Sequence, residues 1–230
     1  RKDKYTDFSF RGQDQIWWDG FNAADDYATY EYYLDTGFYL FKRWQDNWAD
    51  IDLFDPDDLV HFEDVRQGGA NTANIKVAAG ALAEHSDRLK DIFVNGDRNV
   101  AGVYGVTFYI RGKPWVVSVD DYMLFRGTQP PYSLKFSKQS RDDLAIWGPV
   151  LEKAWAKVRG NFVNVDGGVV KNGLRLLTGV PVFTYATNTI TTQTALTEAF
   201  DRIKQADEAN WIMAATTEGT EGEENECGLV

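Results

Sequence analysis

Residues 100–119 alternate between outward and inward positions on both sides of a short turn, and this pattern restricts the fold more than any other part of the sequence. A period of two is typical of half-buried strands, and two such runs joined through a Gly- and Pro-containing turn are typical of a β-hairpin. The turn is predicted at residues 111–114, Arg-Gly-Lys-Pro, and Asp120-Asp121 is expected to end the second strand. The fold must therefore include antiparallel sheet.

Helical patterns flank this hairpin and make the expected fold class α+β. Residues 72–82 carry apolar side chains at spacings of three and four, with Asn71 or Thr72 as the expected cap. A second helix is predicted over residues 143–158, where one apolar stripe contains Leu144, Trp147, Leu151, Trp155 and Val158. A third helix is predicted around Leu196, Phe200 and Ile203, followed by an apolar strand at residues 211–215.

Composition narrows the classes of function. The chain has 24 basic and 35 acidic residues and a net charge of -11, so it would repel phosphate backbones and anionic membrane surfaces. No apolar stretch approaches the roughly 20 residues of a membrane-spanning helix. A lone cysteine, Cys227, excludes an internal disulfide and fits a reducing compartment. We expect a soluble intracellular protein that neither binds nucleic acid nor inserts into membranes.

The motifs along the chain follow the order found in one known family. Residues 67–74 read Gln-Gly-Gly-Ala-Asn-Thr-Ala-Asn, residues 100–104 read Val-Ala-Gly-Val-Tyr, and residues 112–121 read Gly-Lys-Pro-Trp-Val-Val-Ser-Val-Asp-Asp. Residues 146–157 read Ile-Trp-Gly-Pro-Val-Leu-Glu-Lys-Ala-Trp-Ala-Lys, and two Gly-containing segments follow at 166–168 and 177–180. Over about residues 60–230 this order and spacing resemble the protease core of calpains, which are papain-like cysteine proteases.

The resemblance implies a domain plan. Residues 1–45 would be an aromatic and acidic N-terminal extension, and residues 46–186 the helical first subdomain with its β-hairpin. Residues 187–230 would be a linker and the start of the β-rich second subdomain. The family's catalytic histidine would come directly after Val230, so that neither it nor the catalytic asparagine lies in this sequence.

The nucleophile motif of the family is Gln-Gly-x-x-Gly-Asp-Cys-Trp, and the resemblance places Ala73 where the family has cysteine. A methyl group cannot attack a carbonyl, since papain-like chemistry needs a thiolate at a helix N-terminus. Gln67 matches the oxyanion-hole glutamine. Because Asn71, Thr72 and Asn74 also depart from the motif, natural loss of activity explains the pattern better than one engineered change.

No other residue in the sequence is an obvious replacement for the cysteine. Thr72 is the neighbouring hydroxyl, but a threonine nucleophile needs an adjacent base, and a capping role is the better interpretation. His61 and His85 do not match the family's histidine motif. They also lack a second histidine at the spacing that forms a helical metal site.

The resemblance also implies a calcium site, which this sequence retains only in part. Asp64 stands nine residues before Ala73, where calpains have a calcium ligand, but Ala145 occupies the position of a second, glutamate ligand. Calcium prefers six to eight oxygen ligands, so loss of that carboxylate predicts that no cofactor is bound. Asp64 is then interpreted as a solvated loop acid.

Three functions remain open on the sequence alone. The first is a calpain-like pseudoprotease that serves as a structural or protein-binding module, with other protein chains of a stable cytoskeletal or organellar assembly as partners. The second is a calcium-dependent cysteine endopeptidase whose nucleophile was removed by engineering. The third is an unrelated enzyme with accidental motif matches, which requires the Trp-containing motifs to lie far from the Ala73 helix.

Overall fold

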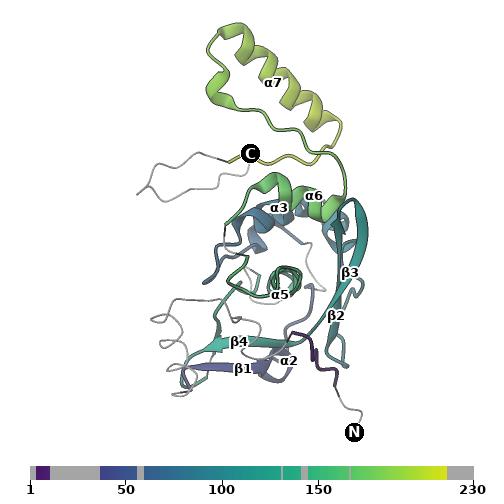
Figure 1. The fold of residues 1–230 in the computed structure, drawn as a ribbon, viewed down its shortest axis with the longest axis vertical. Coiled ribbons are helices and arrows are strands. Elements are labelled where there is room, and N and C mark those ends of the chain that lie inside the picture. Colours follow the sequence, from purple (N-terminus) through teal and green to yellow (C-terminus); the bar gives the residue numbers. More distant parts are fainter. Residues whose placement is uncertain are drawn as a thin grey trace.

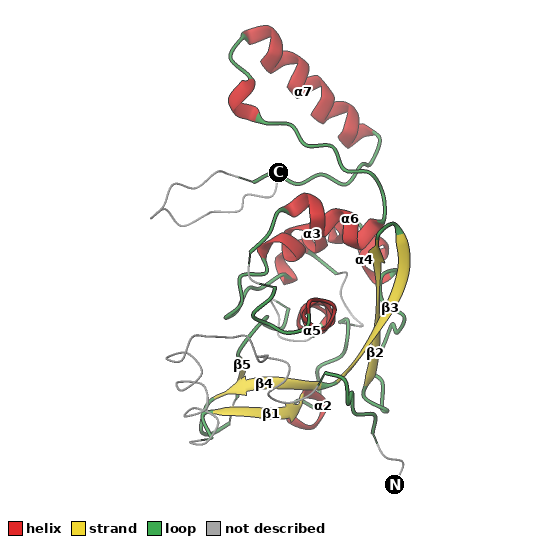
Figure 2. Cartoon of the chain, in the orientation of Figure 1, coloured by secondary structure: helices red, strands yellow, loops and turns green. Residues whose placement is uncertain are grey.

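The computed structural model describes residues 4–10, 37–55, 60–130, 132–140, 145–165 and 167–216. Helices and small antiparallel sheets are mixed along this part of the chain, so the α+β fold class is confirmed (Figure 2). In chain order the elements are β1 (Tyr39–Arg43), α2 (Trp44–Asn47), the 3-10 helix η2 (Phe62–Asp64), α3 (Ala73–Ala83), α4 (Ser86–Lys90), β2 (Val103–Ile110), β3 (Lys113–Asp120), β4 (Tyr122–Arg126), β5 (Ser133–Leu134), α5 (Trp147–Arg159), α6 (Val170–Thr178), the 3-10 helix η3 (Thr187–Thr189) and α7 (Gln193–Glu208).

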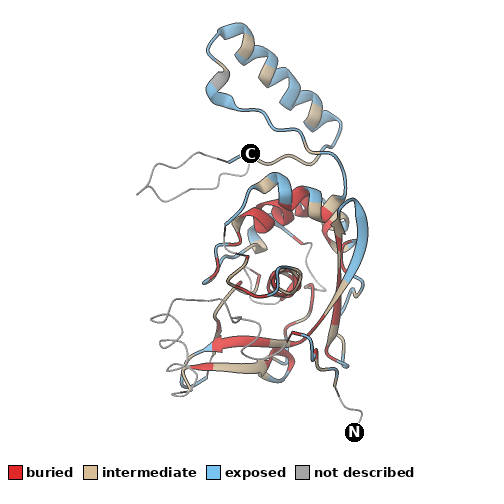
Figure 3. Ribbon diagram, in the orientation of Figure 1, coloured by how far each residue is buried: buried red, intermediate tan, exposed pale blue. Residues whose placement is uncertain are grey.

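Helix α5 occupies the centre of the body. Figure 1 shows α5 between the layer of α3 and α6 and the strands β1 and β4, with the β2–β3 hairpin along one side. Trp147 and Leu151 of α5 share one core cluster with Ile75 of α3, and each of the three is at most 2% exposed. Both α5 and the inner faces around it are buried (Figure 3). The central helix therefore joins the elements that carry the predicted site.

The β2–β3 hairpin is confirmed with a tighter turn than predicted. The strands pair from Val103 opposite Asp120 to Ile110 opposite Lys113, which leaves Arg111 and Gly112 as a two-residue turn. Both turn residues have positive φ angles, 53° and 74°, as a hairpin turn matching the twist of its strands requires.

A second sheet, of order β1-β4-β5, has no counterpart in the sequence predictions. Strand β1 lies inside the predicted N-terminal extension, yet Tyr39 pairs with Arg126 of β4 and is only 8% exposed. The extension also contains Trp17, Trp18, Tyr30, Tyr32 and Tyr33, which lie outside the described residues.

Two helices and one strand differ from the predictions. The helix expected from residue 143 begins at Trp147, while Leu144 lies outside the described residues. Helix α6 was not predicted, because the glycines on both sides of it, Gly167-Gly168 and Gly179, indicate turns. The prediction of a strand at 211–215 was wrong. This segment is irregular and belongs to neither of the described sheets.

Helix α7 confirms the third predicted helix but leaves its apolar stripe uncovered. Leu196, Phe200 and Ile203 are 53%, 65% and 54% exposed. Figure 1 shows α7 standing away from α3, α5 and α6. Within the described ranges, no helix combines the length and apolar character needed to cross a bilayer.

Candidate functional site

The predicted nucleophile position lies at the start of α3. Ala73 is the first residue of this helix and is partly exposed, and the helix ends at Ala83, as the sequence predicted. Gln67 is exposed in the loop that precedes it. A partly exposed helix N-terminus is the location at which a cysteine thiol would have its pKa lowered. Here the side chain at that place is a methyl group.

The glycines after Gln67 let this loop lie against residues 135–136. A Cβ atom on Gly68 would stand 1.6 Å from the carbonyl oxygen of Phe136, so no larger residue fits without moving the backbone. The Gly69 N–H donates to the Lys135 carbonyl at 2.9 Å. Close packing therefore fixes the path of the chain from Gln67 into α3.

Thr72 is buried and bonded to a carboxylate. Its side chain is 0% exposed, and its Oγ1 donates to Oε1 of Glu152 at 2.5 Å. Thr72 occupies the N-cap position of α3, where its carbonyl accepts from the Lys76 N–H at 3.1 Å, but its hydroxyl makes no capping bond. The capping prediction holds for the position and fails for the side chain, because Glu152 competes successfully for the hydroxyl.

Glu152, which the sequence analysis did not identify, binds several polar groups near the start of α3. It is 1% exposed, and its Oε2 accepts from the Ser137 N–H at 2.7 Å. Its Oε1 lies 3.0 Å from Nζ of Lys76, which projects from the first turn of α3. One buried carboxylate on α5 thus holds the first turn of α3 and the 135–140 loop together.

Burial lowers the pKa of Lys76, and the charge of Glu152 opposes that shift. Taking an ammonium group out of water disfavours its charged form, whereas a carboxylate close by favours it. The pair is therefore a buried ion pair whose members depend on each other.

Asn74 packs against two glycines, one just before α6 and one within it. A Cβ atom on Gly173 would stand 2.3 Å from the Asn74 carbonyl oxygen, and one on Gly168 would stand 2.7 Å from the Asn74 Nδ2. The Gly167 N–H donates to the Asn71 carbonyl at 2.8 Å. Two motifs that are far apart in the sequence, at 71–74 and 167–173, therefore meet at the start of α3.

The two histidines do not join this group. His61 precedes η2, where its Nδ1 accepts from the Glu63 N–H at 3.4 Å. His85 follows α3 at the end opposite Ala73. At about 1.5 Å of rise per residue the length of α3 separates His85 from the predicted nucleophile position.

The residues at the predicted calcium position do not fit that ion. Oδ2 of Asp64 accepts from the His61 N–H at 2.9 Å. Ala145 has no side-chain oxygen, is 3% exposed, and donates its backbone N–H to Oγ of Ser140 at 2.9 Å. Among the described residues, no group of three or more His, Cys, Asp or Glu side chains is arranged so that it could hold a metal ion. Calcium needs a denser set of oxygens than these two positions supply.

The Trp-containing motifs do not lie far from the Ala73 helix, as accidental motif matches would require. Val106 and Val119 of the hairpin and Trp147 of α5 belong to the same core cluster as Ile75 of α3. The motifs of the sequence are thus neighbours in space around the Ala73 helix.

Comparisons with known proteins agree with this arrangement. Calpain-type cysteine protease DEK1 of Zea mays is 32% identical over 120 residues, 52% of this chain and 5% of that protein. Calpain-type cysteine protease ADL1 of Oryza sativa subsp. japonica gives the same identity and coverage. Calpain clp-4 of Caenorhabditis elegans is 33% identical over 124 residues, 54% of this chain and 14% of that protein. The chain thus matches a small part of each relative. The model of the calpain family cysteine proteases matches residues 27–230, and the chain belongs to that family.

Proposed function

We propose that this chain is a catalytically inactive calpain core that serves as a structural or protein-binding module. The observation that carries the proposal is Ala73, a methyl side chain at the partly exposed start of α3. Papain-like hydrolysis begins with a thiolate attacking the scissile carbonyl, and alanine offers no lone pair for that step. Gln67 would then stand beside a reaction that does not start.

The surroundings of Ala73 support natural loss over a single engineered change. Thr72 is buried and donates to Glu152, so its oxygen is neither accessible to a peptide nor paired with a free base. Asn74 is packed against the α6 segment. An engineer who wished only to remove the nucleophile would have had no reason to change these neighbours.

The proposal extends to calcium and to partners. With Asp64 accepting from the His61 N–H and Ala145 without a side-chain oxygen, we infer that this core binds no calcium. Proteins of a stable intracellular assembly, such as a cytoskeletal or organellar complex, are the proposed partners. The uncovered stripe of α7 at Leu196, Phe200 and Ile203 supports protein binding, because exposed apolar groups of this kind often mark interaction sites.

Restoring the cysteine separates this proposal from the engineered-protease alternative. The change is Ala73→Cys in the full-length protein, assayed with a fluorogenic peptide library with and without calcium. We expect no turnover, because the thiol alone does not rebuild the altered positions 71, 72 and 74. Alkylation by iodoacetamide, located to position 73 by peptide mapping, serves as the control that the introduced thiol is accessible. Calcium-dependent turnover by this variant would favour a protease from which only the nucleophile had been removed.

A further inference from the structure

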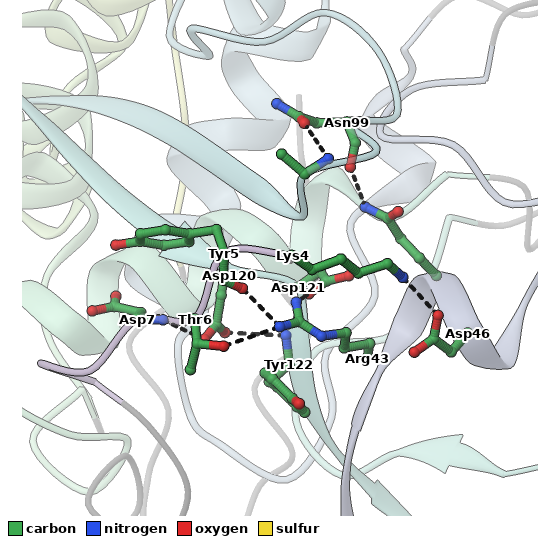
Figure 4. A network of polar contacts seen from close by, with 12 residues as sticks. Lys4, Tyr5, Thr6, Asp7, Arg43, Asp46, Asn99, Asp120, Asp121 and Tyr122 are labelled. Atoms are coloured by element: carbon green, nitrogen blue, oxygen red, sulfur yellow. Dashed lines mark hydrogen bonds and ion pairs between the residues drawn. The ribbon is translucent and has the colours of Figure 1, made fainter. Parts of the chain in front are cut away.

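Residues 4–10, here called the N-terminal strap, lie across the body and end in a turn, in which the Phe10 N–H donates to the Asp7 carbonyl at 3.2 Å. The Tyr5 N–H donates to the Ala101 carbonyl at 2.7 Å, which ties the strap to the segment before β2. Nη2 of Arg43 donates to the Tyr5 carbonyl at 2.7 Å and to Oγ1 of Thr6 at 3.1 Å. Figure 4 shows these groups converging where β1, the end of β3 and the strap meet.

Asp7 is the charged anchor of the strap. It is 1% exposed, and its backbone N–H donates to Oδ2 of Asp120 at 2.8 Å. Its own Oδ2 lies 2.6 Å from Nζ of Lys157 on α5. Its Oδ1 accepts from the N–H and hydroxyl of Ser9, at 3.1 and 2.7 Å. Asp7 thus binds the body twice: its carboxylate pairs with Lys157, and its N–H donates to the Asp120 carboxylate.

Phe10 is the apolar anchor at the other end of the strap. It is 2% exposed and its ring centroid lies 6.4 Å from that of Phe162. Ala70, Ala156 and Val165 complete the cluster around it. Phe8, between the two anchors, is 76% exposed. The two buried side chains of the strap are therefore an aspartate and a phenylalanine three residues later.

The side chains of the body that bind the strap also have interaction partners within the body. Oδ1 of Asp120 is 2.5 Å from Nζ of Lys153 and accepts from the Tyr122 N–H at 3.1 Å. Lys157 donates to the Ser118 carbonyl at 2.8 Å, and Arg43 is paired with Asp121. Removal of the strap would leave each charged group with a partner. A binding site that is built in advance loses little free energy to ordering when its ligand arrives.

We infer that these groups form a peptide-docking groove, that residues 4–10 fill it as a tethered ligand, and that the strap of a second copy of this chain can replace them. The ligand is a short peptide in which a turn joins a buried aspartate to a buried phenylalanine three residues later. A tethered ligand competes at a high effective concentration, so exchange between copies depends on protein concentration. This inference uses neither Gln67 nor Ala73 and stands whether or not the chain is catalytic.

The test uses the whole chain with a specific protease site inserted between Gly20 and Phe21, so that cleavage releases the tether but leaves both pieces present. A dye-labelled peptide of residues 4–10 represents the strap of the second copy. We expect this peptide to bind the cleaved protein saturably, as measured by fluorescence anisotropy, and to bind the uncleaved protein much more weakly.

Three peptide variants make the test specific. Asp7→Asn and Phe10→Ala are expected to weaken binding at least tenfold, because each removes one anchor. The matched control, Phe8→Ala, should change binding less than threefold. Equal binding by all three peptides would overturn the inference. So would absence of exchange while circular dichroism shows a folded body, or loss of the folded body on cleavage, since the strap would then be a fixed part of the fold.

Discussion

At the scale of single residues, Glu152 is the side chain on which the start of α3 depends most. Replacing it by glutamine keeps the shape but removes the negative charge that faces buried Lys76 at 3.0 Å. Breaking a buried pair by removing one partner costs about 3 kcal/mol or more. We expect Glu152→Gln to lower the free energy of unfolding by about that amount, measured by urea denaturation at pH 7.

Glu208→Gln is the matched control for this substitution. Glu208 lies 3.8 Å from Lys204 on α7, and both side chains are more than half exposed. Exposed pairs of this kind contribute about 0.5 kcal/mol or less. If the two variants lost equal stability, the assignment of Glu152 as a buried anchor would be wrong.

Lys138 is expected to make the stability of the folded chain depend on pH in the alkaline range. Burial first, and then the nearby cations Arg126, Lys135 and Arg66, lower the pKa of Lys138 from 10.5 to about 8. Between these two pH values the unfolded chain binds more protons than the folded one, so this lysine makes stability rise with pH. We expect wild type to gain stability relative to Lys138→Met between pH 8 and pH 10, in parallel urea titrations. A relative loss with rising pH would show that the fold favours the charged form.

At the scale of elements, the contact of α6 with α3 depends on Gly173. Alanine is the better helix former by about 1 kcal/mol, but a Cβ atom at Gly173 would lie 2.3 Å from the Asn74 carbonyl oxygen. We expect Gly173→Ala to lower the melting temperature, because overpacking typically costs about 1 to 3 kcal/mol.

Gly148→Ala provides the opposite expectation on α5. A Cβ atom there would meet Oγ of Ser137 at 3.6 Å, an ordinary contact. Where the backbone tolerates the change, replacing glycine by alanine stabilises by about 0.4 to 1 kcal/mol. The melting temperature of Gly148→Ala should therefore equal or exceed that of wild type. A lower value would mean that crowding at the 135–140 loop is tighter than this contact indicates.

Sequence periodicity identified the elements whose apolar spacing is regular within a short stretch of the chain. The hairpin around Arg111-Gly112 and helices α3 and α7 were predicted because their local patterns are strong. Helix α5 was predicted as amphipathic, but it is central, and even Glu152 and Lys153 are buried. A stripe on one face could not reveal this. Strands β1 and β4 escaped because their pairing joins segments far apart in the chain.

The same limit applies to the candidate site. The motif register placed Ala73 at a helix start and Gln67 in the loop before it, where the structure has them. Their roles as degenerate nucleophile and oxyanion-hole positions remain predictions. Glu152 could not be found, because a carboxylate within a helix reads as a solvated group until the elements around it are placed. Only tertiary packing reveals that it binds Thr72 and Lys76.

At the scale of the whole molecule, we expect calcium to leave the stability of the folded protein unchanged. A ligand that binds only the folded state raises its stability in proportion to the logarithm of the ligand concentration above the Kd. Because Ala145 supplies no carboxylate, we expect the melting temperature to be the same in a calcium chelator and in micromolar to millimolar calcium. Magnesium at equal ionic strength is the control. A rise at micromolar calcium alone would show that other carboxylates replace the missing ligand.

The central claim is that a calpain core has lost its chemistry at residue 73, and peptidase activity of the full-length protein purified from its natural source tests it most directly. Mass spectrometry of the same preparation identifies residue 73, and a fluorogenic peptide library with and without calcium measures turnover. We predict alanine at position 73 and no turnover above that of heat-denatured protein. Cysteine at that position, or turnover that an active-site thiol reagent abolishes, would contradict the claim.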